Sequence, residues 1–225
     1  MKKILTVATA ATLLCSAANG AVSLQFSDTN NVLTNFLNGA GNNTTGMVWG
    51  ILVDTQGNGF AGGNYDPGFS LAATTNALTL TVSNGLASDD RLFIASANMV
   101  TTTTTADETP AGMNRILTMG NMNINSPVAF GQSYAIIWFD TTTRPTATTD
   151  GLKYGIFVPP ATNVGLANTT TANKLPGADG TFSYAAIFDG PDAPKTMDYV
   201  LGVPEPSALA LGAIGALGLL RRRRN

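Results

Sequence analysis

Histidine is absent from this sequence of 225 residues, and cysteine occurs only once, at position 15. Without histidine the chain has neither a Ser-His-Asp triad nor a Cys-His pair, and it lacks the usual nitrogen ligands of zinc. Cys15 lies in an N-terminal stretch that we expect to be removed, so the mature protein would form no disulfide. Glutamate is scarce too: Glu108 is the only one between residues 22 and 202, which weakens the case for hydrolysis by a carboxylate pair. We predict no catalytic residue, no cofactor and no enzymatic activity.

Basic side chains are few in the body of the chain, residues 22–202. This segment holds six lysines and arginines against thirteen aspartates and glutamates, a net charge of −7. The net charge of the whole chain is only −2, because the other six basic residues lie in the two terminal segments. A body of this charge would repel phosphate backbones, so we expect no nucleic-acid partner.

The N-terminus has the pattern of a secretory signal peptide. Lys2 and Lys3 precede an uncharged, largely apolar run over residues 4–18, and Ala18-Asn19-Gly20 places small residues where signal peptidase reads them. An N-terminal membrane anchor is the alternative, but the run is shorter than the ~20 strongly apolar residues of a spanning helix. We predict that residues 1–21 form a signal peptide and that signal peptidase leaves Ala21 or Val22 as the new N-terminus.

The body has the pattern of short strands separated by turns. Leu78, Leu80 and Val82 alternate with polar residues, and Asn84-Gly85 is typical of a hairpin turn. Such patterns predict strands over Val22–Phe26, Met47–Asp54, Ala77–Ser83, Arg91–Ala97, Arg115–Met119, Ser133–Asp140, Tyr154–Val158, Thr181–Phe188 and Thr196–Leu201. One short helix is predicted over Asp28–Leu37. We expect one all-β domain over residues 22–202, an antiparallel β-sandwich of jelly-roll type, with an immunoglobulin-like sandwich second.

One stretch of the body resembles the start of a calcium loop. Asp54, Gln56 and Asn58 offer oxygen ligands at positions one, three and five, and glycine follows at six. The twelfth position is Tyr65 rather than glutamate, so we favour a simple β-turn and retain the three residues as a weak metal candidate. Asp89 and Asp90 are adjacent, and we expect them in a solvated turn after Asn84-Gly85.

Aromatic and threonine-rich stretches each allow two interpretations. The tryptophans and tyrosines could form a flat platform on which sugars stack. The two tryptophans lie in the most apolar predicted strands, however, which favours a place in the core. The seven residues are Trp49, Trp138, Tyr65, Tyr134, Tyr154, Tyr184 and Tyr199. Threonines cluster at 101–105, 141–149 and 169–171. We expect exposed loops or edge strands there, with glycan attachment to the hydroxyls as the alternative.

The C-terminal segment, residues 203–225, has three consecutive parts. Pro204-Glu205-Pro206 is stiff and extended and cannot join a helix. Fourteen uncharged residues follow at 207–220, enough for a helix of about 21 Å, short for a ~30 Å hydrocarbon core. Arg221, Arg222, Arg223 and Arg224 then form a stop-transfer cluster that we expect to stay cytoplasmic. An unprocessed transmembrane anchor is one interpretation, but it has no use for the Pro-Glu-Pro.

These three parts together resemble the PEP-CTERM family of sorting signals. Pro204, Glu205 and Pro206 match the motif of the family, and the apolar helix and basic end match as well. The resemblance implies recognition by exosortase, a membrane transpeptidase-like enzyme, in a Gram-negative-type bacterium that makes extracellular polysaccharide or biofilm. The protein would be anchored transiently in the inner membrane through residues 207–220 and then reach the cell surface or extracellular matrix.

For the body we keep three functional hypotheses. The first is a structural or adhesive surface or matrix protein without enzymatic activity. The second is a carbohydrate-binding module retained in exopolysaccharide. The third, which we favour least, is a carboxylate-based polysaccharide hydrolase or lyase.

Overall fold

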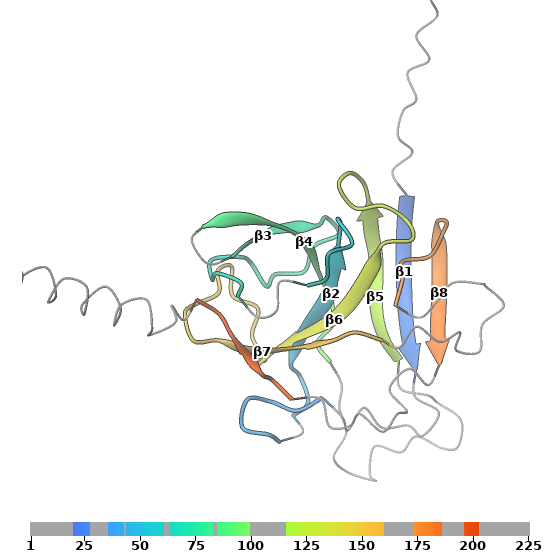
Figure 1. The fold of residues 1–225 in the computed structure, drawn as a ribbon. Helices are drawn as coiled ribbons and strands as arrows, with labels where there is room; N and C mark the ends of the chain where they lie inside the picture. Colours follow the sequence, from blue (N-terminus) through green and yellow to red (C-terminus); the bar gives the residue numbers. More distant parts are fainter. Residues whose placement is uncertain are drawn as a thin grey trace, which may run out of the picture.

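The computed structural model describes residues 20–27, 36–42, 44–60, 64–82, 85–99, 116–159, 173–185 and 196–202. Within these ranges the regular structure consists of strands, and no helix occurs (Figure 1). The strands are β1 (Gly20–Ser27), β2 (Val48–Asp54), β3 (Leu78–Val82), β4 (Leu86–Ile94), β5 (Ile116–Ile124), β6 (Ser133–Phe139), β7 (Lys153–Phe157), β8 (Gly180–Ala185) and β9 (Tyr199–Val200). The all-β prediction is confirmed, and each strand overlaps one predicted run. The N-terminal segment 1–19 and the C-terminal segment 203–225, with its predicted helix, lie outside the described residues.

The strands form two sheets. One has three strands in the order β5-β1-β8, and the other has six in the order β3-β4-β2-β6-β7-β9. Figure 1 shows the smaller sheet beside the larger one, which curls like half a barrel. Neighbouring strands are antiparallel with one exception among the described pairs: β8 pairs parallel with β1, Val22 facing Gly180. The division of three strands against six and this parallel pair were not predicted.

Apolar side chains cover both faces of the larger sheet. All seven residues of β2 are buried. Because successive side chains of a strand point to opposite faces, Trp49, Ile51 and Val53 enter one core while Val48 and Leu52 enter a second. The first core lies against the smaller sheet, and the second is covered by segments around Tyr65, Leu71 and Leu201. The continuous apolar run of β2 therefore reflects a sheet that is covered on both sides.

The aromatic side chains form the core of the domain. Trp49 and Trp138 face each other across β2 and β6, and each is at most 1% exposed. Their indole N–H groups donate to the carbonyl oxygens of Ala97 and Leu37, each at 3.0 Å, so the polar end of each ring is satisfied. Four tyrosines are also buried: Tyr65, Tyr134, Tyr154 and Tyr184. The core interpretation is confirmed for these six residues, and they form no sugar-stacking platform; Tyr199 is half-buried.

The predictions of a short helix and of threonine-rich loops are only partly covered by the structure. Residues 28–35 of the predicted helix lie outside the described ranges, and Phe36 packs edge-on against Trp138 with ring centroids 4.8 Å apart. The threonine runs at 101–105 and 169–171 also lie outside them. In the stretch 141–149, Thr148 is buried, and its hydroxyl accepts the Gly68 N–H at 2.9 Å. This one threonine ties two loops together, so the stretch is not uniformly exposed.

Candidate functional site

Three aspartates come together where β2 ends and β4 passes beside it. One carboxylate oxygen from each of Asp54, Asp89 and Asp90 lies within 4.8 Å of the others. Asp54 and Asp90 are partners in the antiparallel pairing of β2 with β4, and Asp90 is fully buried. The prediction of a solvated turn at Asp89-Asp90 is wrong. The hairpin already closes at Gly85, whose N–H donates to the carbonyl oxygen of Val82, so β4 starts at Leu86 and carries both aspartates.

The Asp54 carboxylate holds the loop that follows β2. Its Oδ1 accepts the backbone N–H groups of Gln56 at 3.1 Å and Gly57 at 2.6 Å, and its Oδ2 accepts that of Gly59 at 2.7 Å. Gly57 and Gly59 both have positive φ, at 75° and 89°, which lets the backbone curl around the carboxylate. The side chains of Gln56 and Asn58 are exposed. The loop therefore presents amide groups to Asp54, the arrangement of a side-chain-capped turn.

The carboxylates of Asp89 and Asp90 differ in their hydrogen bonds. Asp90 Oδ2 accepts the Tyr65 hydroxyl at 2.6 Å and the Ser88 hydroxyl at 3.2 Å. Asp89 is half-buried, and its Oδ2 is enclosed with no hydrogen-bond partner in the described part of the chain. A cation bound here would have Asp54, Asp89 and Asp90 as its ligands. The loop pattern had instead indicated Asp54, Gln56 and Asn58. Sequence spacing could not reveal this set, because it depends on the register between two strands.

We expect calcium to change the melting temperature of the protein little. Three backbone N–H groups already occupy most of the lone pairs of the Asp54 carboxylate, which leaves it a weak ligand for a cation. Differential scanning fluorimetry with millimolar calcium against EDTA measures this. A rise of many degrees would contradict the expectation, since a ligand that binds only the native state stabilises it by RT ln(1 + [L]/Kd). Asp89→Asn is the matched variant: it leaves the Asp54 loop intact and should remove any such rise.

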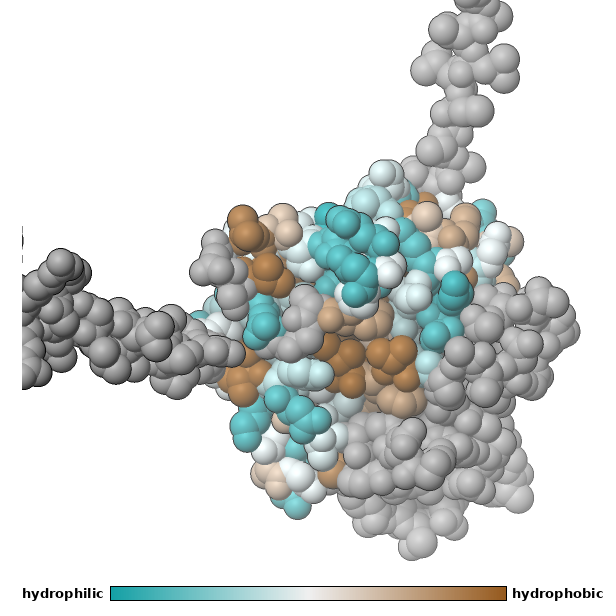
Figure 2. All heavy atoms as spheres, viewed as in Figure 1, coloured by the Kyte–Doolittle hydropathy of each residue, from teal (hydrophilic) through white to brown (hydrophobic). Residues whose placement is uncertain are grey.

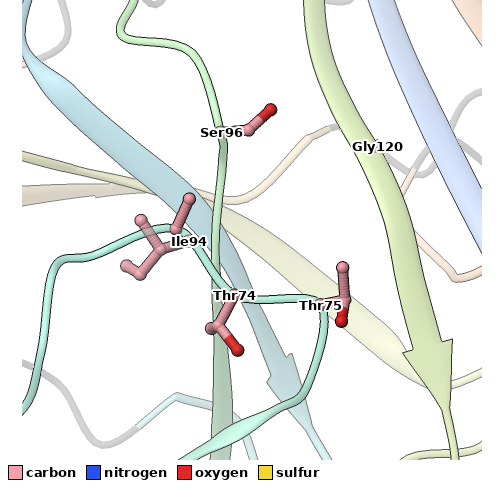
Figure 3. Close-up of a pocket in the computed structure, with 6 residues that line it drawn as sticks. Thr74, Thr75, Ile94, Ser96 and Gly120 are labelled. Atoms are coloured by element: carbon pink, nitrogen blue, oxygen red, sulfur yellow. The ribbon is translucent and has the colours of Figure 1, made fainter.

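Several described residues also line a pocket of about 330 Å³ (Figure 3). Thr74 and Thr75 come from the segment before β3, Ile94 ends β4, Ser96 follows it, and Gly120 lies in β5. The lining is neutral and presents hydroxyl groups without a carboxylate. Its volume is at the lower end of the range for small-molecule sites. The pocket offers hydrogen bonds but no acid or base.

Exposed apolar side chains are scattered over the surface. Figure 2 shows them on one face as separate patches among polar side chains. Among the described residues, the exposed large hydrophobic side chains are Leu86, Phe130 and Val158, which come from three separate segments. Scattered apolar residues of this kind are common on soluble domains.

The described part of the chain ends in a well-packed segment. β9 pairs with β7 at the edge of the larger sheet, and Leu201 just after it is fully buried. A profile of the PEP-CTERM protein-sorting motif matches residues 202–224, starting at the last described residue. The chain carries a PEP-CTERM protein-sorting motif. The resemblance noted from Pro204, Glu205 and Pro206 is thereby confirmed, and the motif makes this an exported protein that exosortase sorts to the cell surface or beyond.

No curated protein and no solved structure matches the chain. The sorting residues Pro204 to Pro206, the apolar run 207–220 and the stop-transfer cluster Arg221 to Arg224 all lie outside the described residues. Within the described part, no helical segment has the length and apolarity that crossing a bilayer requires.

Proposed function

We propose that the body of this PEP-CTERM protein is a structural or adhesive domain without enzymatic activity, displayed at the cell surface or in the extracellular matrix. The observation that carries the proposal is that the groups most capable of chemistry serve the fold. Asp54 holds a loop, Asp90 accepts the Tyr65 hydroxyl, and six of the seven tryptophans and tyrosines lie in the core. The exposed pocket has no carboxylate in its lining.

The protonation of the buried tyrosines supports the same proposal. Burial, with a smaller contribution from Tyr184, holds the pKa of Tyr134 well above its ordinary value. Burial raises the pKa of Tyr184 to about 12. A phenol at either position stays protonated near neutral pH, and its burial keeps it away from a substrate. Neither is poised as a general base.

The route to the surface follows from the two ends of the sequence. Signal peptidase would remove the N-terminal segment, and β1 begins at Gly20, one or two residues before the proposed new N-terminus at Ala21 or Val22. Residues 207–220 would then hold the chain in the inner membrane of a Gram-negative-type bacterium, with Arg221 to Arg224 in the cytoplasm. Exosortase would act on Pro204-Glu205-Pro206 and free the body from this transient anchor.

Carbohydrate binding is the second candidate function. The hydroxyl-lined, neutral pocket beside Thr74, Thr75 and Ser96 favours it, since such groups form hydrogen bonds with uncharged sugars. Exopolysaccharide made by the same cell would be the ligand. This candidate keeps the same route of export and adds one specific contact to the matrix.

A binding screen and an activity screen separate these functions. We expect the processed protein, purified from the culture, to bind no glycan on an array with high affinity and to release no reducing ends or unsaturated products from exopolysaccharide. Intact mass spectrometry of the same sample reports both cleavages and any glycans on threonine. Specific glycan binding that Ser96→Trp abolishes would favour the carbohydrate-binding function. Polysaccharide cleavage would overturn the proposal.

A further inference from the structure

The last residues of the body are fastened by backbone hydrogen bonds. Leu201 N–H donates to the carbonyl oxygen of Leu152 at 2.9 Å, and the Leu201 carbonyl oxygen accepts the Gly151 N–H at 3.0 Å. The next residue, Gly202, donates its N–H to the carbonyl oxygen of Tyr65 at 3.2 Å. We call residues 196–202, which include β9, the C-terminal strap. The strap is part of the fold up to its last residue.

The strap also ends in a close-packed position. A Cβ atom at Gly202 would lie 2.4 Å from Asp150 Oδ1 and 2.6 Å from Pro67 Cδ, and the residue has a positive φ of 62°. Only glycine fits both the space and the backbone conformation. The last described residue of the body is therefore packed against Pro67 and Asp150.

The sorting motif begins almost at this exit. Val203 alone separates Gly202 from Pro204. Two residue steps of extended chain reach about 7 Å. A single α-helix is about 10 Å across, so an element of an enzyme could not pass between the docked body and the motif. The matched motif itself starts at Gly202, inside the strap.

We propose that the C-terminal strap detaches from the body when exosortase takes the motif, so that residues 196–202 become part of the extended segment the enzyme holds. This inference rests on the proposed processing by exosortase. Enzymes that cut or transfer peptides generally bind several residues in extended form, with the main chain hydrogen-bonded to the enzyme. While the strap is docked, the hydrogen bonds of Leu201 and Gly202 are made within the body.

The structure makes the strap the easiest part of the larger sheet to open. β9 has two residues and pairs with β7 at only two positions, Lys153 with Val200 and Tyr154 with Tyr199. It lies at the edge of the sheet, whereas β2 and β6 have strands on both sides. Short elements at an edge open locally at a lower free energy than the core. Opening would expose the fully buried Leu201 and would also remove the stacking of Tyr199 on Tyr154 and the contact of Met197 with the first core.

A disulfide across β7 and β9 tests the proposal. Lys153→Cys with Val200→Cys places two cysteines at directly opposed positions, and Cys15 is the only other cysteine in the full chain. We expect the oxidised double variant to be processed about tenfold more slowly than wild type or more in pulse-chase experiments, because the bond opposes opening by at least this factor. Reduction should restore the rate. Each single-cysteine variant should behave as wild type.

Two further variants show whether slow processing of the oxidised protein comes from the docked strap. A flexible linker of about twelve Gly and Ser residues between Gly202 and Val203, about 20 Å in mean length, gives access to the motif with the strap docked. It should restore processing of the oxidised variant. Processing of the oxidised variant at the wild-type rate would overturn the proposal, and so would slowing that the linker does not relieve. Glu205→Ala in the same strain distinguishes failure of the strap proposal from failure of the exosortase proposal. If Glu205→Ala is cut at the wild-type rate, the exosortase assignment itself has failed.

Discussion

Replacing Glu205 by alanine is expected to leave the protein uncut in the inner membrane. The change keeps the apolar run 207–220 and the four terminal arginines, so the means of stopping in the membrane are unaltered. Arginine is costly to move across a bilayer, so we expect export to stall with Arg221 to Arg224 inside and the Pro-Glu-Pro just outside. Only recognition of the motif is lost. Fractionation and mass spectrometry should find full-length C-termini in the membrane and little protein outside.

A neighbouring substitution provides the control. Ser207→Ala lies outside the Pro-Glu-Pro and preserves both the apolar run and the charge. It should be processed as wild type. An unprocessed anchor would treat Glu205→Ala and Ser207→Ala alike. If both variants are released like wild type, the residues of the motif are not what the enzyme reads.

Gly155→Ala is expected to destabilise the body strongly. Gly155 of β7 faces Trp138 of β6, and a Cβ atom there would lie 2.2 Å from Cζ2, 2.5 Å from Cη2 and 2.6 Å from Cε2 of the indole. The ring has little freedom to move, because its N–H donates to the Leu37 carbonyl and Phe36 packs edge-on against it. Overpacking in a well-packed core typically costs about 1–3 kcal/mol, occasionally more, and we expect the upper part of this range or beyond.

Chemical denaturation of the processed protein measures the change. Gly120→Ala is the matched control, since a Cβ atom there has no neighbour within 4 Å and the residue also lies in a strand. That variant should change the free energy of unfolding little. Adding Trp138→Phe to Gly155→Ala should recover part of the loss, because the smaller ring makes room for the new methyl group. Equal stability of Gly155→Ala and Gly120→Ala would show that the core repacks around the added group without strain.

Local patterns in the sequence determined the class of the fold. Alternation such as Leu78, Leu80 and Val82 requires only neighbours along the chain, and so does a turn at Asn84-Gly85. β3 and β4 do form a hairpin here, but β4 starts at Leu86, opposite Val82, and not at Arg91 as predicted. The tail is equally local, because the sorting motif is a linear segment that includes Pro204, Glu205 and Pro206. For that reason the sorting motif could be identified from the residues themselves.

Long-range pairing decided what the local patterns left open. β1 pairs parallel with β8 although about 150 residues separate them, and no local pattern specifies such a partner. Asp54 and Asp90 meet only because β2 and β4 pair in one register; a shift by one residue would turn every side chain of a strand to the other face. The strap also depends on long-range contacts. The sequence places Val203 next to Pro204, but only the packing of Leu201 and Gly202 shows that the folded body extends as far as the sorting motif. Sequence therefore specified the strands and the signal, whereas the tertiary structure specified which side chains meet and how close the body lies to the sorting motif.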